Sequence, residues 1–212
     1  KTNKKVFLWS TTFEIVFEKQ QTFDEIVDED GFACEDLGAL QQWIVSTFAE
    51  LCQLPEFEII GLNFSAYGAS FVYVDRVGEP VAPLYNYLKP VSKAFPYAEY
   101  SGENEFARKT ASPILGNLNS GLQVYESTFR PFWPEVFKAV HFPNYLASLF
   151  TGRLVSEITS IGCHTALWDF DLSQYHPWVA TIQDRLAPIS KEAYLPIDGI
   201  NYGLGLHDSS AA

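Results

Sequence analysis

The residues best placed to do chemistry stand near the end of the sequence, around Asp208. Glycines precede this aspartate and the small residues 209–212 follow it, a pattern that predicts a strand turning into a helix. Small neighbours let a ligand approach closely, and the free amides that open a helix can hold an anion. An aspartate at such a turn can act as a general base, taking the proton from a hydroxyl that attacks a phosphoryl group. A helix N-cap is an equally good interpretation of Asp208, and the adjacent His207 can orient the hydroxyl.

A second candidate site is the polar and basic run that opens the sequence. It supplies hydroxyl, amide and ammonium groups just before an expected strand at 6–9, and such groups on a tight connection can bind phosphate oxygens. An exposed basic terminus explains the same run, because clustered charges usually face solvent. The run consists of Lys1, Thr2, Asn3, Lys4 and Lys5.

Two aromatic segments have the composition of a carbohydrate site. Tyr67 and Gly68 lie between expected strands at 58–65 and 70–75, and Asn86 stands between two tyrosines after Pro83. A sugar packs its C–H face against an aromatic ring and its hydroxyls against amides and short polar side chains. Taken alone, the first segment is better interpreted as a bulge with a packing tyrosine, and the second segment allows the same two interpretations.

The overall composition narrows the class of ligand. The 212 residues carry a net charge of −12 and are 47% hydrophobic, which describes a globular chain able to bury a core. An acidic chain is poorly suited to nucleic acid, whose binding depends on clustered lysine and arginine. We therefore expect a small neutral ligand, no nucleic acid and, since no window has the length of a transmembrane helix, no membrane.

The sequence predicts no metal site of its own. Cys34, Cys52 and Cys163 are far apart and lack the spacing of a zinc site, so we expect three buried thiols, a reducing compartment and, by default, the cytoplasm. The remaining histidines stand beside apolar residues and are interpreted as core or surface residues rather than ligands; they are His141, His164 and His176. Because methionine is absent, we also expect a piece of a longer chain or omitted residues.

The elements that would position these residues form an α/β pattern. We expect a hairpin from strands at 6–9 and 14–18, a helix from Glu35 to about residue 51 that ends before Pro55, and a turn at 77–80. The second half is predicted to be more helical, at 118–128, 134–140 and 143–150, with a short helix within 173–184 and an irregular segment at 186–199. The last strand runs into the Asp208 turn.

Together these segments resemble the FGGY family of carbohydrate kinases along essentially the whole chain. The opening run is similar to the family's first phosphate-binding loop, and 65–72 is similar to its sugar-contacting strand pair. Further segments match the family's later motifs in order, the last being the turn that opens its second domain; they are 141–146, 149–152 with Phe150 in place of the family's leucine, 156–160 with 167–169, and 203–212.

The resemblance implies an activity and a fold. The family phosphorylates sugars with ATP and Mg²⁺, which gives Asp208 the role of proton acceptor, Gly68, His207 and Ser209 contacts with sugar, and residues 1–5 contacts with ATP phosphates. The implied fold is a ribonuclease H-like, actin-like ATPase domain with a mixed sheet flanked by helices. Residues 1–200 would form the N-terminal sugar-binding domain, and 201–212 the start of the ATP-binding domain, whose remainder is absent.

Substrate and partners follow only in outline. A ketose such as L-rhamnulose, L-fuculose or xylulose, or a polyol, is the expected substrate, and a homodimer is a possible assembly. Tyr85 to Lys89 depart from the family's Asp and Arg pair, and lysines replace other residues around the phosphate loop. The resemblance therefore does not identify the sugar. The alternatives are a catalytically inactive sugar-binding or regulatory homologue and an unrelated aromatic-rich glycan-binding domain.

Overall fold

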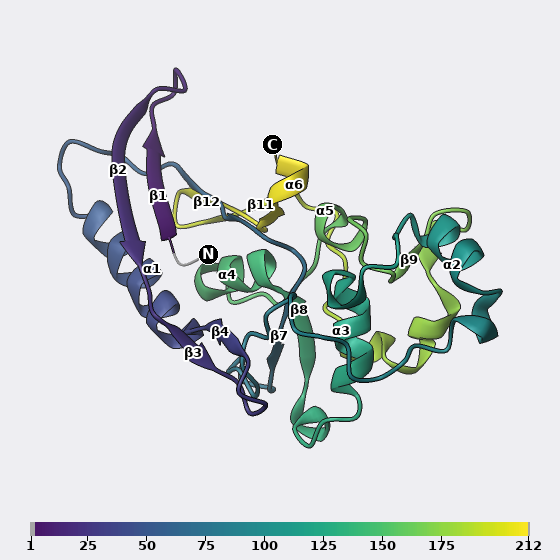
Figure 1. Ribbon diagram of the computed structural model, residues 1–212. Coiled ribbons are helices and arrows are strands. Elements are labelled where there is room, and N and C mark those ends of the chain that lie inside the picture. The colour runs from purple at the N-terminus through teal and green to yellow at the C-terminus, as the bar shows by residue number, and fades with distance from the viewer. Residues whose placement is uncertain (1–2, 212) are drawn as a thin grey trace.

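A long antiparallel hairpin begins the part of the chain that the structure describes, residues 3–211 of a computed structural model. Its strands are β1 (Asn3–Trp9) and β2 (Ile15–Thr22), and Figure 1 shows its tip projecting beyond the rest of the chain, with the first helix alongside β2. The expected hairpin is confirmed. The predicted loop is wrong for Asn3, Lys4 and Lys5, because these residues already belong to β1 and pair in register with β2.

The first helix, α1 (Leu37–Leu51), has the predicted position and a buried apolar stripe. Asp36 caps its N-terminus by accepting a 2.9 Å hydrogen bond from the Ala39 amide. The Lys19 ammonium on β2 reaches Glu50 Oε2 on α1 at 2.6 Å and ties the hairpin to the helix. A short antiparallel pair precedes α1, formed by β3 (Glu25–Val27) and β4 (Ala33–Glu35).

A strand pair that is buried except at Lys138 separates the two larger apolar clusters of the core. In β7 (Phe71–Val74), Phe71 and Tyr73 pack into one apolar cluster, whereas Val72 and Val74 pack into another, as alternation along a strand requires. Its antiparallel partner is β8 (Lys138–His141). The predicted helix at 134–140 is therefore wrong: only a 3-10 turn at Trp133–Glu135 precedes this strand. A short apolar run buried on both faces has no periodicity that separates strand from helix.

The helix on one side of this pair is α3 (Ser120–Ser127), which confirms the expected helix at 118–128. An aromatic lobe extends from it, in which Phe95 packs against Phe106, Tyr125 and Trp178. The helix predicted within 173–184 consists of a strand and two 3-10 turns. The elements of this lobe are α2 (Glu103–Thr110), β9 (Trp168–Asp169), β10 (Gln174–Tyr175) and 3-10 turns at Tyr97–Tyr100, Gly116–Leu118, Pro177–Thr181 and Gln183–Arg185.

The helix on the other side is α4 (Phe142–Thr151), which packs with α1 and ends at Gly152 in the left-handed conformation. The segment expected to be irregular contains β11 (Tyr194–Ile197), antiparallel to β12 (Ile200–Gly203). Because β12 also pairs in parallel with β5 (Gly61–Leu62), this three-stranded sheet is mixed. The remaining elements are β6 (Ser65–Ala66), α5 (Ile158–Ile161), β13 (Leu206–His207) and α6 (Asp208–Ala211).

The architecture is thus mixed α/β, as expected, with small sheets between helices. The expectation of three buried thiols is wrong for Cys52, which is exposed just after α1; Cys34 is buried and Cys163 half-buried. Among residues 3–211, no helix is both long enough and apolar enough to cross a membrane.

Gly205 is expected to tolerate no side chain. It has a φ of +82°, and a Cβ there would lie 2.1 Å from the carbonyl oxygen of Pro143, in the first turn of α4. Gly199 has a similar φ of +85° but no atom near a Cβ, so Gly199→Ala controls for backbone strain alone. We expect Gly205→Ala to lower the free energy of unfolding by about 1–3 kcal/mol more than Gly199→Ala in urea denaturation. Equal losses would show that Gly205 is not held against α4.

Candidate functional site

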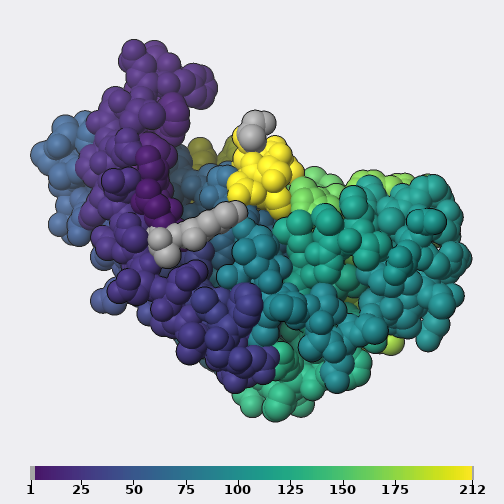
Figure 2. Space-filling view, in the orientation of Figure 1, coloured from purple at the N-terminus to yellow at the C-terminus, as the bar shows by residue number. Residues whose placement is uncertain are grey.

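A short parallel strand pair brings the two main candidate segments together. Leu206 of β13 pairs with Ser65 of β6, and His207 pairs with Ala66. The Leu206 amide also donates a 2.8 Å hydrogen bond to the Phe64 carbonyl. Both strands therefore end side by side, with Tyr67 and Gly68 following one and Asp208 and Ser209 following the other. Figure 2 shows the surface notched between the projecting hairpin and the yellow C-terminal end that carries this turn.

Gly68 is in direct contact with His207. A Cβ at position 68 would lie 2.0 Å from Cδ2 and 2.9 Å from Nε2 of the His207 ring, closer than side chains pack. Only glycine allows the imidazole to lie against this backbone. The fold thus joins two residues that the sequence assigned independently to sugar binding.

Asp208 is the exposed carboxylate of the site. It opens α6, and its side chain is 54% exposed. Oδ1 accepts a 2.8 Å hydrogen bond from the Ser209 amide and lies 3.4 Å from the Ser209 hydroxyl. These contacts orient one carboxylate oxygen while leaving the group open to solvent, so the carboxylate can reach a ligand that enters from outside.

His207, in contrast, is 4% exposed and fixed from three sides. Its backbone amide donates to Thr159 Oγ1 at 3.2 Å, and its Nδ1 accepts from the Ser209 amide at 3.1 Å. Burial holds the pKa of the imidazole below its ordinary value, while Asp208 opposes this shift and His164 adds to it. The ring is therefore neutral at pH 7. With Nδ1 accepting, the proton is on Nε2, which can donate to an oxygen.

The residue that fixes Thr159 is Glu157. Its carboxylate caps α5 by accepting from the Thr159 amide at 2.6 Å and from the Ser160 amide at 2.7 Å. This cap sets the orientation of the short helix and hence of the Thr159 hydroxyl that holds the His207 backbone. The sequence placed 156–160 in a family motif but did not single out Thr159.

Tyr67 belongs to a second, adjoining hollow. Its hydroxyl donates to Glu35 Oε1 at 3.2 Å, and the other oxygen of Glu35 lies 2.5 Å from the Lys4 ammonium. Burial and the Glu35 carboxylate raise the pKa of Tyr67. Together with Asn86 and Tyr87, Tyr67 and Glu35 line an open cavity of about 120 Å³. Sequence reasoning missed Glu35, which it used only as a helix start.

Asn86 lines this cavity, but both atoms of its side-chain amide form hydrogen bonds with backbone groups. Its Nδ2 donates to the Ala33 carbonyl at 3.2 Å, and its Oδ1 accepts from the Leu88 amide at 2.9 Å. Nearby, the Lys89 ammonium lies 2.5 Å from the buried carboxylate of Asp28. This segment, which departs from the family pattern, thus stabilises the loop that leads into β4.

The candidate phosphate-binding residues are only partly within the described chain. Lys1 and Thr2 lie outside the described residues. Lys4 reaches the cavity through Glu35, whereas Lys5 lies 2.8 Å from Glu18 across the hairpin. Asn3 Nδ2 donates to Gln20 Oε1 at 3.4 Å. The structure therefore brings Lys4 near Tyr67, and it turns Lys5 towards the partner strand.

Known structures supply an independent comparison. The chain is similar to a carbohydrate kinase from Novosphingobium aromaticivorans, with 24% identity, a TM-score of 0.80, and coverage of 100% of this chain and 48% of that one. A ligand-bound xylulose kinase from Lactobacillus acidophilus is 16% identical with a TM-score of 0.83, covering 99% and 46%. A Plasmodium falciparum glycerol kinase solved with ADP is 15% identical with a TM-score of 0.77, covering 99% and 47%.

These likenesses show that the chain has the fold found over about half the length of these carbohydrate kinases. The expected resemblance is thereby confirmed at the level of the fold. No protein-family model matches the sequence, and no curated protein matches it. What the whole protein does is accordingly argued from the site.

The contact between Gly68 and His207 gives a direct test of the site. Gly68→Ala forces a buried ring aside, so we expect a loss of about 1–3 kcal/mol in the free energy of unfolding and a changed NMR signal for the His207 imidazole. Gly61→Ala is the control, because its Cβ would meet only Asn201 O at 3.5 Å. If Gly68→Ala were as stable as Gly61→Ala and left the His207 imidazole signals unchanged, the contact between Gly68 and His207 would be contradicted.

A second buried imidazole, His141, makes stability depend on pH. It lies between the hydroxyls of Ser120 and Ser156, and burial, aided by His207, lowers its pKa to about 3. The unfolded chain, with a pKa near 6.5, binds the proton first, so stability falls as pH drops below 6.5. Between pH 7 and pH 5 we expect the free energy of unfolding to fall by about 2 kcal/mol because of this group.

Urea denaturation at both pH values, with His141→Gln beside the wild type, measures this cost. Groups other than His141 titrate in both proteins, so the difference between their pH dependences isolates the buried imidazole. If the free energy of unfolding fell equally between pH 7 and pH 5 in the wild type and the variant, His141 would be protonated in the folded state as readily as in the unfolded chain.

Proposed function

We propose that this chain is part of an ATP-dependent carbohydrate kinase of the FGGY type, which transfers the γ-phosphoryl group of ATP to a hydroxyl of a neutral sugar or polyol. Three likenesses in fold support the proposal, since the similar structures are those of a carbohydrate kinase, a xylulose kinase and a glycerol kinase. The chain spans about half of each, so the activity belongs to the whole protein.

The observation that carries the proposal is the pairing of β6 with β13. It sets an exposed carboxylate, Asp208, beside a neutral buried imidazole, His207, and against the glycine that follows Tyr67. A base next to a fixed hydrogen-bond donor is what deprotonation of a sugar hydroxyl requires, because the hydroxyl must be oriented as well as deprotonated.

Each residue has a distinct role in this proposal. Asp208 takes the proton from the attacking hydroxyl, and Ser209 holds one of its oxygens in place through the amide. His207 Nε2 donates to a neighbouring sugar oxygen. Gly68 lets the sugar ring approach the backbone, and Tyr67 supplies an aromatic wall for it. Asn86 contributes less than its position suggested, because its amide already bonds the backbone.

The residues present fit Mg-ATP only in part. The carboxylate of Asp208 is of the oxygen type that Mg²⁺ prefers, but as the proposed base it must stay free of the ion, which leaves phosphates and waters as the ligands of Mg²⁺. Lys4 and Lys5 are each ion-paired, so a phosphate would have to compete with Glu35 or Glu18 for them. When bound, Mg-ATP supplies the phosphoryl group and neutralises its charge; the chain's own contribution is to hold the sugar and accept its proton.

The proposed function also implies a division of the chain into two domains. We assign residues 1–200 to a ribonuclease H-like sugar-binding domain and 201–212 to the start of an ATP-binding domain. The mixed β5–β12–β11 sheet and the flanking helices are compatible with that assignment. A ketose or polyol substrate, a homodimer and a cytoplasmic location remain predictions of the resemblance.

A sugar-binding homologue without phosphoryl transfer is the second candidate. The observation that favours it is the pairing of the described N-terminal lysines with carboxylates, which weakens the case for a phosphate site at β1. Such a protein would bind a sugar at the same turn but release no ADP.

Replacing the proposed base separates the two candidates. In the complete protein, Asp208→Asn keeps the size and hydrogen-bonding capacity of the side chain but removes its basicity. We expect kcat for sugar-dependent ADP release to fall at least about a hundredfold, with sugar affinity changed only a few-fold in calorimetric titration.

The matched control is Asp198→Asn, an exposed aspartate in the turn between β11 and β12. Its φ of +48° suits asparagine as well as aspartate, so this substitution should leave folding and ADP release unchanged. Near-normal kcat in Asp208→Asn would refute the assigned base. Sugar binding without ADP release in the wild type would favour the binding homologue.

A further inference from the structure

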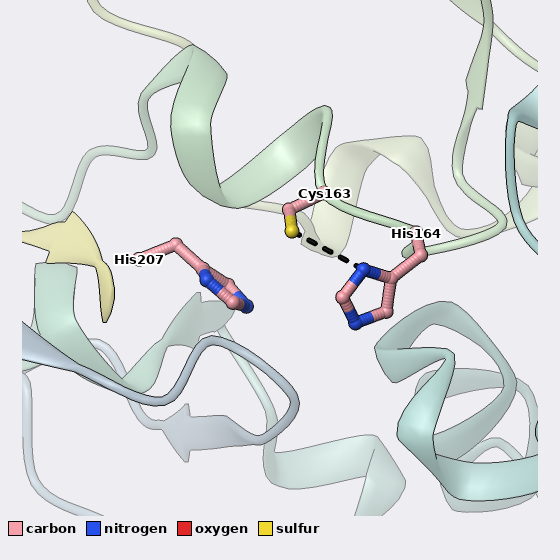
Figure 3. A group of neighbouring side chains, drawn as sticks. All are labelled: Cys163, His164 and His207. Atoms are coloured by element: carbon pink, nitrogen blue, oxygen red, sulfur yellow. Dashed lines mark hydrogen bonds between the residues drawn. The ribbon is translucent and has the colours of Figure 1, made fainter. Parts of the chain in front are cut away.

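Beside the proposed sugar site, three side chains with metal-binding atoms converge. The ligand atoms of Cys163, His164 and His207 all lie within 4.8 Å of one another. Cys163 Sγ is 3.2 Å from His164 Nδ1, and the two imidazole rings meet edge to face with centroids 5.8 Å apart. Figure 3 shows the sulfur and the two rings directed into one common space, from the loop after α5 and from β13.

The backbone explains how two adjacent residues point the same way. Neighbouring side chains normally diverge, but His164 has a φ of +40°, a conformation that few residues other than glycine adopt. Its carbonyl is fixed by a 2.7 Å hydrogen bond from Asn119 Nδ2, and the next carbonyl, that of Thr165, accepts from the Gly121 amide at 2.8 Å. The start of α3 therefore holds this loop in the converging form.

We propose that Cys163, His164 and His207 form a binding site for a divalent transition-metal cation of the zinc class. One sulfur and two imidazole nitrogens are the donor set that Zn²⁺ selects over the oxygen ligands preferred by Mg²⁺. Bonds of roughly 2.3 Å to sulfur and 2.0–2.1 Å to nitrogen require donor atoms about 3.3–3.6 Å apart in a tetrahedral site. The observed spacing meets this through small side-chain rotations.

The surroundings can adjust to the cation without leaving a polar group unpaired. Metal bound at His207 Nε2 moves the ring proton to Nδ1, which lies 3.4 Å from Asp208 Oδ1 and can donate to it. The Ser209 amide, which now donates to both groups, keeps Asp208 as its acceptor. An imidazole held between metal and carboxylate is the usual second-shell arrangement of metal sites. Cys163 and His164 are half-buried, which leaves the cation an entry path and an open coordination position for water.

A cation here is separate from the Mg²⁺ of the proposed kinase reaction. It would engage His207, the same imidazole assigned to the sugar, so bound metal and sugar would exclude each other. Metal binding itself does not depend on the proposed function and is measurable without any catalysis.

Titration of the protein with Co²⁺ tests the site, because a cobalt–thiolate bond gives a charge-transfer absorption that Co²⁺ bound by oxygen or nitrogen alone lacks. Under anaerobic conditions we expect one equivalent to bind with this band, Zn²⁺ to bleach it by displacement, and excess Mg²⁺ to leave it unchanged. Cys163→Ser should lose the band, and His164→Gln should weaken binding at least tenfold.

Cys52→Ser is the control, since it removes an exposed thiol far from the cluster along the chain and should leave the titration unaltered. Circular dichroism of each variant checks that the fold persists. Absence of the band in the wild type, or an undiminished band in folded Cys163→Ser, would overturn the proposal.

Discussion

The parallel pairing of β6 with β13 is the interaction on which the site depends. Each strand is only two residues long, so the pairing is stable only because its surroundings fix both partners. Asn63 Oδ1 accepts from the Gly205 amide at 3.0 Å, and the buried Asn144 of α4 donates to the Leu204 carbonyl at 2.7 Å. The last strand is therefore seated on α4, and α4 in turn packs on the buried β7–β8 pair. A side chain at Gly205 would collide with α4, and one at Gly68 would collide with the His207 ring.

The charges around the turn explain why a neutral ligand suits it. His207 and His141 are buried without a charge, the lysine nearest the cavity is balanced by Glu35, and Asp208 is the exposed carboxylate. An anionic substrate would meet an unbalanced carboxylate, whereas a sugar hydroxyl can use it as a base. Cys163 and His164, the other two ligands of the proposed cation site, lie beside the same turn.

The sequence predicted those elements whose structure is determined by interactions between residues close together along the chain. The apolar period of α1, the first hairpin and the turn at Asp208 all depend on near neighbours, and all were expected. The strand β8 was mistaken for a helix because burial on both faces erases its periodicity. The β11–β12 hairpin was missed because Pro196 lies within its first strand, a position that usually argues against a strand.

For the site, residue types indicated the members but not their contacts. Tyr67, Gly68, His207 and Asp208 were each singled out from their neighbours in the sequence. Nothing in the sequence spacing could show that β6 and β13 lie side by side. Nor could it show that His164 adopts the left-handed conformation, which directs its side chain towards Cys163. Both depend on the tertiary fold, as does the ion pair that occupies Lys4.

The turn at Asp208 is proposed to serve phosphoryl transfer to a neutral sugar. The measurement that tests it most directly is ADP release by the complete protein with Mg-ATP across a panel of free pentoses, hexoses, deoxyketoses and polyols. We expect at least one ketose or polyol to raise ADP release well above the rate without sugar, and phosphorylated sugar to accumulate in an amount equal to the ADP. If sugars bind at the turn but none raises ADP release, the claim is contradicted.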